Sequence, residues 1–348
     1  MKNILSYTPE ELKGLMVEIG EPAYRAGQIF SQLHKGVAVG EMTNVGKKTK
    51  ESLAARVDCS FPSVRRKLVS ALDGTVKYLF ELSDKNCIES VVMKYEHGYT
   101  ICISSQVGCR MGCKFCASTI AGRVRDLEAG ELLGQIIAAQ RDLGIRISNV
   151  VMMGIGEPLD NFDNVIKFLR IVNLDEGINI GYRHISLSTC GIVPKIYELA
   201  KLDLPITLSV SLHAADDGTR SAIMPVNNSW GVGELLDACR EYYKATGRRI
   251  SFEYTLIRGK NDSADNAVHL ANVLNSRLRS RSETMPIHVN LIPVNEVEES
   301  GFKSAGRDTV RRFAAELEKR GIRATVRRTL GSDINASCGQ LRREDSKE

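Results

Sequence analysis

Six apolar runs, each followed by a segment with helical periodicity, occupy the chain from residue 99 onward, and this alternation constrains the fold more than any other feature. Short apolar runs rich in β-branched residues are typical of buried strands, and strands that alternate with amphipathic helices are typical of parallel sheets. Right-handed crossovers between such strands curl the sheet into an open, partial barrel. The predicted strands are residues 99–104, 147–154, 184–189, 205–213, 249–257 and 287–294.

The chain before the barrel has a different pattern. Three short helices are predicted, the first with Thr8 as its N-cap, and two strand-like segments connect them to the barrel. The predicted bounds are 8–20, 22–36 and 46–57 for the helices and 75–84 and 87–104 for the strand-like segments. We therefore expect an α/β protein with an N-terminal helical domain, a barrel core and a C-terminal extension, over residues 1–83, 84–330 and 331–348.

Composition places the chain among globular proteins, with 43% hydrophobic and 26% charged residues. The formal net charge is +5, and the excess lies in basic runs that would suit a polyanion, with a solvated basic face as the competing explanation. The N-terminus has no apolar segment of a signal peptide, and no later window approaches the length of a membrane span. We expect a cytoplasmic protein without membrane contact. The basic runs are residues 65–67, 277–281, 311–312 and 327–328.

Nine cysteines in a cytosolic chain indicate metal or redox chemistry rather than a disulfide framework. Cys109, Cys113 and Cys116 follow the first predicted barrel strand. Three thiolates are one fewer than a closed zinc site or a fully ligated iron–sulfur cube uses, so one metal position would stay open. An open iron of a [4Fe–4S] cluster could chelate the amino and carboxylate groups of S-adenosylmethionine. A zinc site with a distant fourth ligand, or buried apolar cysteines, are the competing explanations.

The other unusual polar residues also follow predicted strands, at the barrel edge where such folds gather their chemistry. The segment 154–158, "GIGEP", follows the second strand, and Ser188, Ser211 and His213 belong to the third and fourth. A glycine lets backbone carbonyls approach a ligand, and a carboxylate can hold an ammonium group. A capped strand-to-helix turn and a hydrogen-bonded core histidine would explain the same residues without a ligand.

Taken together, these motifs resemble the radical S-adenosylmethionine (SAM) enzymes and, among them, the RlmN/Cfr family of RNA adenine methyltransferases. Besides the three cysteines, the resemblance lies in "MGIGEPLDN", "ISLSTCGIVP", "SVSLHA", "IMPVN", "FEYTLIRGKNDS", "HVNLIPVN" and "DINASCGQL". It implies a partial (β/α)6 radical SAM barrel with a [4Fe–4S] cluster on the three cysteines. It also implies SAM binding by Gly156, Glu157, Ser188, Ser211, Leu212, His213 and Asn295.

The resemblance further assigns roles to three residues outside the barrel motifs. Cys338 would be methylated by one SAM molecule and carry that methyl group to RNA, while a second SAM would supply the radical. Cys102 would then form a transient disulfide with Cys338, and Glu89 would accept the proton from the substrate carbon. Because an aromatic C2–H carbon is a poor nucleophile toward a sulfonium methyl group, a thiolate intermediate makes chemical sense.

The implied substrates are an adenosine in 23S rRNA and the adenosine 3′ to the anticodon in some tRNAs, both methylated at C2. A flavodoxin-like electron donor and a monomeric state are expected. Glu157-Pro158 is similar to the C2 type, and a C8-methylating enzyme of the same family remains an alternative. A zinc-containing RNA-binding protein is the alternative from a different class, resting on the basic runs and clustered cysteines.

Overall fold

A computed structural model of the chain describes residues 1–279, 285–294, 301–336 and 341. These residues form one ten-stranded sheet in the order β1-β2-β3-β4-β7-β8-β9-β10-β11-β12, with β5 and β6 paired separately. The strands are β1 (Ser63–Val69), β2 (Val76–Glu81), β3 (Cys87–Tyr95), β4 (Gly98–Cys102), β5 (Gln106–Gly108), β6 (Arg123–Asp126), β7 (Ile147–Met152), β8 (Ile185–Thr189), β9 (Thr207–Ser211), β10 (Ile250–Leu256), β11 (Ile287–Pro293) and β12 (Arg323–Val326).

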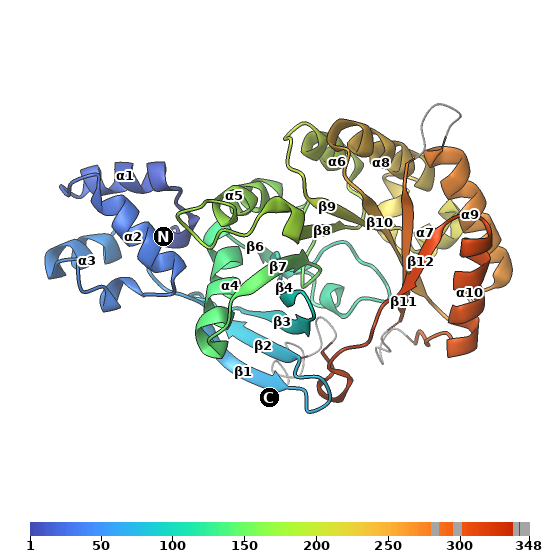
Figure 1. Cartoon of the computed structure of the whole chain (residues 1–348), viewed down its shortest axis with the longest axis horizontal. Helices are drawn as coiled ribbons and strands as arrows, with labels where there is room; N and C mark the ends of the chain where they lie inside the picture. The colour runs from blue at the N-terminus through green and yellow to red at the C-terminus, as the bar shows by residue number, and fades with distance from the viewer. Residues whose placement is uncertain (280–284, 295–300, 337–340, 342–348) are drawn as a thin grey trace.

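The barrel consists of the parallel strands β4 and β7 to β12. Six of them are the predicted barrel strands, and β12 continues the parallel sheet at its far edge. The helices pack along the outside of this curved sheet (Figure 1). They are α4 (Ala129–Leu143), α5 (Phe162–Val172), α6 (Val193–Ala200), α7 (Asp217–Ile223), α8 (Val232–Thr246), α9 (Ala264–Leu278) and α10 (Arg307–Lys319).

The sheet extends beyond the barrel through three antiparallel strands, β1, β2 and β3. The predicted strand-like link is therefore part of the main sheet. The basic run at residues 65–67, which sequence reasoning left inside the helical region, forms the edge strand β1. Charged side chains on an edge strand discourage pairing with another chain, which gives this run a structural explanation. The chain turns from β1 into β2 at residues 70–75.

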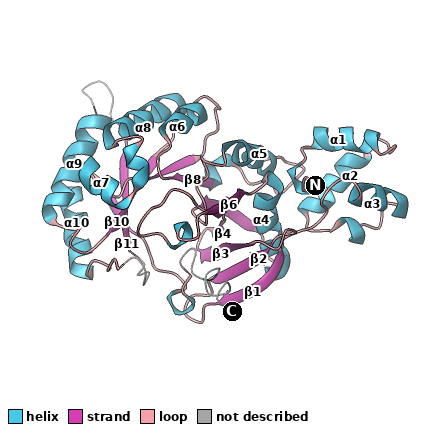
Figure 2. Ribbon diagram, turned by 180° about the vertical axis from the view of Figure 1, so that it is seen from behind, coloured by secondary structure: helices cyan, strands magenta, loops and turns pink. Residues whose placement is uncertain are grey.

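The three predicted N-terminal helices are present at one end of the long axis of the molecule (Figures 1 and 2). They are α1 (Pro9–Glu18), α2 (Arg25–His34) and α3 (Lys47–Ala54), and Thr8 caps α1 as expected, within a capping box with Glu11. The predicted division of the chain after residues 83 and 330 stays a prediction. Residue 83 lies between β2 and β3, which are neighbouring strands of one sheet.

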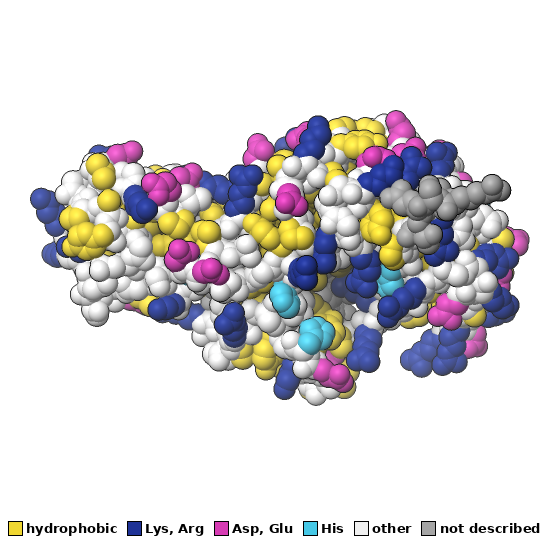
Figure 3. All heavy atoms as spheres, turned by 45° about the horizontal axis from the view of Figure 1, so that its top comes forward, with side chains coloured by type: hydrophobic (Ala, Val, Ile, Leu, Met, Phe, Trp, Pro, Cys, Tyr) yellow, Lys and Arg dark blue, Asp and Glu magenta, His cyan; other side chains and the backbone are white. Residues whose placement is uncertain are grey.

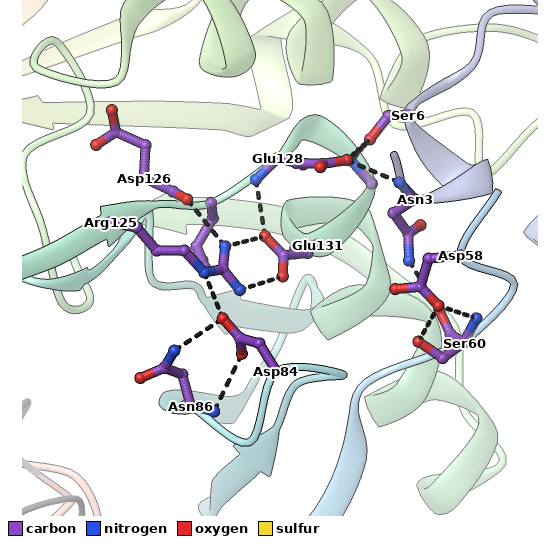
Figure 4. A network of polar contacts seen from close by, with 12 residues as sticks. Asn3, Ser6, Asp58, Ser60, Asp84, Asn86, Arg125, Asp126, Glu128 and Glu131 are labelled. Carbon is purple, nitrogen blue, oxygen red and sulfur yellow. Dashed lines mark hydrogen bonds and ion pairs between the residues drawn. The ribbon is translucent and has the colours of Figure 1, made fainter. Parts of the chain in front are cut away.

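The N-terminal segment is joined to the start of α4 by a polar network (Figure 4). The Glu128 carboxylate accepts hydrogen bonds from the amide of Asn3 at 2.8 Å and from the hydroxyl of Ser6 at 3.1 Å. Arg125, on β6, donates to both oxygens of Glu131 at 2.7 Å. Charge-assisted bonds of this kind fix relative orientation as well as adding energy. Among the described residues, no helix has both the length and the apolar character needed to span a bilayer.

Candidate active site

A loop closed by the short β5–β6 ladder carries the three clustered cysteines. The amide of Cys109 donates to the carbonyl of Gly122 at 3.0 Å, which closes the loop at its base. Gly108, with φ +80°, lies so close to this strand that a Cβ would be 1.9 Å from the same carbonyl oxygen. A side chain at this position is therefore incompatible with the loop. The hydroxyl of Thr119 donates to the carbonyls of Cys113 and Cys116 at 3.1 and 2.9 Å.

The same loop is attached to two neighbouring parts of the barrel edge. The amide of Lys114 donates to the carbonyl of Ile223 at the end of α7, at 2.9 Å. Arg110 forms an ion pair with Asp160, whose carboxylate accepts from Nε at 3.0 Å, just after the turn that follows β7. These contacts hold the cysteine loop against the turn that follows β7 and against the end of α7.

The three cysteines line one cavity, which we call the triad cavity. Its walls include Cys109, Cys113 and Cys116 together with residues from the carboxyl ends of β7, β8, β9 and β10. Burial raises the pKa of Cys109 to about 12 and raises the pKa of Cys113 as well. Thiols in this setting stay protonated until a cation stabilises the thiolate form. No three side chains in the described part of the chain are already gathered as metal ligands.

The turn after β7 presents Gly156 and Glu157 to the triad cavity. Gly156 has φ +109°, and a Cβ there would lie 2.7 Å from the amide nitrogen of Gln106, so the turn requires glycine. The buried Glu157 carboxylate accepts from the amides of Leu159 at 2.9 Å and Cys190 at 2.7 Å. Burial raises the pKa of Glu157, and these two amide donors oppose the shift. The carboxylate thus caps its own turn while lining the cavity.

The other predicted cofactor residues divide into three groups. Ser188, Ser211 and His213 line the triad cavity. Leu212 is fully buried, and its amide donates to the carbonyl of Glu253; it is not among the described residues that line the cavity. Asn295 lies outside the described residues.

His213 is both a buried, hydrogen-bonded histidine and part of the cavity wall. It has φ +57°, and its ring Nδ1 accepts from the amide of Thr255 at 2.9 Å. Burial lowers the pKa of His213 to about 3, which keeps the ring neutral. The ring packs edge-on against Phe115 of the cysteine loop, with centroids 4.9 Å apart. It is therefore a hydrogen-bonded core histidine that also faces the cavity.

A second cavity adjoins the first and is lined by Cys102, so we call it the Cys102 cavity. The two cavities share Cys116 and Arg327 in their walls. Leu330 and Ala336, from the C-terminal segment, also line the Cys102 cavity. Cys338 lies outside the described residues, two positions after Ala336. Cys102 and Cys116 therefore both line the Cys102 cavity, to which Leu330 and Ala336 also contribute.

Glu89 is buried rather than exposed on β3, the strand whose Val91 and Met93 line the Cys102 cavity. Its side chain is 2% accessible and forms an ion pair with Lys77 of β2 at 3.2 Å. A solvent-exposed strand carboxylate would be the alternative to a site residue, and the burial of Glu89 argues against that alternative. A charge this deep in a protein is costly unless it is paired.

Comparison with known proteins identifies the family to which this chain belongs. Residues 103–271 match the Radical SAM superfamily, and residues 2–58 match the ribosomal RNA large subunit methyltransferase N-terminal domain. Relatives from Clostridium novyi (strain NT) and Clostridium acetobutylicum (strain ATCC 824) are both named "Probable dual-specificity RNA methyltransferase RlmN". They are 52% and 51% identical, covering 99% and 100% of this chain and 98% and 99% of their own lengths. The chain belongs to the RlmN family.

A solved structure agrees with this membership. The crystal structure of a radical SAM methyltransferase from Sphaerobacter thermophilus is 41% identical, covers 98% of this chain and 99% of its own, and superposes with a TM-score of 0.91. The predicted fold class, a radical SAM barrel with an N-terminal domain, is confirmed. As an RlmN-family protein, the chain is an RNA methyltransferase that uses a [4Fe–4S] cluster and SAM. The three thiols on one cavity wall fit such a cluster, because cysteine thiolates are its usual ligands.

Two buried cations near the site carry no sequence prediction. Arg220, at 0% exposure, donates to the carbonyls of Cys190, Ser211 and Leu212 at 2.7 to 3.0 Å, and so ties together the ends of β8 and β9. Lys77 is equally buried. Its only signal in the sequence is a lysine between hydrophobic residues in "VKYLF", and this pattern does not show which face of the strand is buried.

Proposed function

We propose that this RlmN-family enzyme methylates C2 of an adenosine in 23S rRNA and of the adenosine 3′ to the anticodon in some tRNAs. The methyl group would travel on Cys338. The observation that carries the proposal is the pair of adjoining cavities, one lined by the cysteine triad and the other by Cys102 and the C-terminal segment as far as Ala336. A mechanism that passes the methyl group through Cys338 needs a second thiol, such as Cys102, close to the cysteine triad.

The proposed chemistry divides between the cofactors and the chain. When bound, the cluster and SAM supply the 5′-deoxyadenosyl radical that attack on an unreactive ring carbon requires. The thiolate of Cys338 would take a methyl group from the sulfonium of SAM, because the ring carbon is too weak a nucleophile to do so. The radical would remove a hydrogen atom from that S-methyl group, and the resulting carbon radical would form a bond to C2. Glu89 would accept the proton from C2. Attack by the Cys102 thiolate on the sulfur of Cys338 would break the C–S bond and form the disulfide. The freed carbon would take up a proton to become the methyl group, and the surplus electron would return to the oxidised cluster.

The proposed SAM site consists of Gly156, Glu157, Ser188, Ser211, Leu212, His213 and Asn295. Two features support it. Residues at the ends of β7, β8 and β9 line the triad cavity, and Gly156 allows a ligand to approach the backbone closely there. Leu212 is fully buried and is not among the described residues that line the triad cavity, so its inclusion rests on the resemblance.

The substrate proposal is supported by charge at the cavity mouth. Arg327 and Arg328 are exposed and line the Cys102 cavity. Figure 3 shows Lys and Arg side chains, in dark blue, around a hollow on one face of the molecule. Phosphates of a folded RNA would be attracted there. A base splayed out of a loop or junction could then enter, as base-modifying enzymes require.

The remaining parts of the proposal concern the cellular setting. We place the enzyme in the cytoplasm as a monomer that receives electrons from a flavodoxin-like protein. Cys102 would have to be regenerated as a thiol after each turnover, which a reducing compartment favours.

The deciding experiment is mass-spectrometric identification of the methylated nucleoside. Reconstituted enzyme would react anaerobically with SAM, a reductant and an unmodified 23S rRNA fragment or tRNA. We expect 2-methyladenosine from both substrates. Formation of 8-methyladenosine would contradict methylation at C2, and methylation of some other nucleoside would contradict adenosine as the substrate.

A further inference from the structure

The buried ion pair between Lys77 and Glu89 lies in the antiparallel extension of the sheet, outside the barrel. The two charged groups are 3.2 Å apart, with side chains 1% and 2% accessible. A lysine is rarely buried this completely without a specific partner or role. The cofactor sites do not use it, so its position needs another explanation.

Strand register places Lys77 on the same face of the sheet as the reactive residues. Lys77 lies opposite Val91 of β3, and Val91 lies opposite Cys102 of β4. Directly opposed residues in antiparallel strands point to the same face, as do residues two apart on one strand. Glu89 precedes Val91 by two residues. Lys77, Glu89 and Cys102 therefore share the face that borders the Cys102 cavity.

The C-terminal segment lies over this face and is held by the same lysine. Lys77 Nζ donates to the carbonyl oxygen of Asn335 at 2.9 Å. The ammonium group has three donors, so it can serve the Glu89 carboxylate and this carbonyl together. One position further on, Ala336 lines the cavity with Cys102.

The turn between β1 and β2 holds the beginning of the same segment. Asp333 accepts from the hydroxyl of Ser70 at 2.7 Å and from the amide of Ala71 at 2.9 Å. The amide of Gly331 donates to Asp73 at 2.8 Å. Figure 1 shows the chain running from β12 down to this turn. The described part of the C-terminal segment is thus attached at both ends, to the turn and to Lys77.

We propose that Lys77 is a positioning residue for the methyl transfer. Its ammonium group holds the Glu89 carboxylate and the Asn335 carbonyl at once. It thereby fixes the proton acceptor relative to the segment that leads to Cys338. The proposal rests on the proposed roles of Glu89 and Cys338. It assigns to the β1–β2 turn the function of attaching that segment to the sheet.

The test compares Lys77→Met, Lys77→Arg and Asp333→Ala with Lys67→Met. Lys67 makes a matched control because it lies on the neighbouring strand β1 and pairs with Asp142 away from the cavity. Each protein is reconstituted, its iron and sulfide are measured, and it reacts with SAM, reductant and RNA. The ratio of 5′-deoxyadenosine released to methylated adenosine formed reports how well radical formation is coupled to transfer. Hydrogen exchange of residues 331–336 reports the attachment of the segment.

We expect Lys77→Met to keep the cluster and SAM cleavage but to raise the ratio at least about tenfold, because small displacements of reacting groups are costly. Exchange in 331–336 should become faster. Lys77→Arg should restore most of the coupling, since a guanidinium can also donate to both partners. Asp333→Ala, an exposed substitution, should speed exchange and raise the ratio without touching the ion pair. Lys67→Met should match the wild type.

An unchanged ratio in Lys77→Met, or a loss of product in proportion to SAM cleavage, would overturn the proposal. If the wild type forms no methylated adenosine, the proposed function fails separately. Hydrogen exchange of residues 331–336 then still tests whether Lys77 holds the segment. Unchanged exchange in Lys77→Met would contradict that part of the proposal. If Lys77→Met does not fold, Asp333→Ala is compared with the wild type instead, and an unchanged ratio together with unchanged exchange in that variant would overturn the proposal.

Discussion

At the scale of single residues, His34 makes the docking of the N-terminal helices sensitive to pH. Its ring is buried at the end of α2, and Nδ1 accepts from the amide of Ile178 at 3.2 Å. Burial lowers the pKa of His34 from 6.5 to about 4. The unfolded chain therefore takes up the proton first, so the stabilisation is complete above pH 6.5 and is lost as pH falls toward 4.

The expected loss attributable to His34 across this window is at most about 3 kcal/mol of unfolding free energy. His34→Gln stays neutral and can still accept the amide hydrogen, so its stability should fall less steeply with acidification than that of the wild type. Exposed His269→Gln is the control. Urea unfolding between pH 7 and pH 4 measures the difference, and parallel curves for wild type and His34→Gln would contradict the assignment.

The two proposed relay thiols should fail in different ways. Cys338→Ala should give no methylated RNA, because the methyl carrier is lost. Cys102→Ala should transfer the carbon to RNA but fail to release it, so a covalent protein–RNA adduct should accumulate. Cys87→Ala, on β3 outside both cavities, should react like the wild type. Denaturing gels with labelled RNA detect the adduct, and normal turnover by Cys338→Ala would exclude the relay.

At the scale of elements, helix α4 is shaped to receive the N-terminal segment. A Cβ on Gly130 would lie 2.6 Å from Oδ1 of Asn3 and 2.7 Å from the amide of Ser6. Gly130→Ala should therefore lower stability by about 1–3 kcal/mol, despite the better helix propensity of alanine. Gly14→Ala in α1, where nothing lies within 4 Å, should raise it by about 0.5–1 kcal/mol. Denaturant unfolding measures the stability of both variants. Equal changes in their unfolding free energy would show that the close approach at Gly130 does not matter.

Some helices and strands could be predicted from the sequence, and others could not. The six barrel strands and the N-terminal helices were predictable because their hydrophobic periods are long and regular. Strand β1 was not, because an edge strand carries charges in place of an apolar run. Strand β12 has four residues and no buried run. The cavity residues could be named from motifs. The burial of Lys77 depends on the register of β2 against β3, and register is a property of the folded sheet. The burial of Arg220 depends on how α7 packs against the ends of β8 and β9.

At the scale of the whole molecule, the sheet connects three functions that the chain keeps apart in sequence. The barrel half presents the cluster loop and the proposed SAM site, the antiparallel half presents Glu89, and the C-terminal segment returns from β12 to cross between them. Cys102 lies on β4, where the two halves meet. The proposed mechanism requires one base to reach both a radical source and a thiol, and Cys102 and Cys116 do line one cavity.

The same architecture predicts where RNA binding should be sensitive to salt. Arg327 and Arg328 line the Cys102 cavity, whereas Arg311 and Arg312 are exposed on α10. Each phosphate contact adds about 0.7 to the slope of log affinity against log salt for single-stranded RNA. Changing both cavity arginines to glutamine should lower the measured slope by as much as about 1.4. The double Gln variant at Arg311 and Arg312 removes the same charge and should leave the slope unchanged. Equal slopes in filter binding for the two variants would place the RNA on another face.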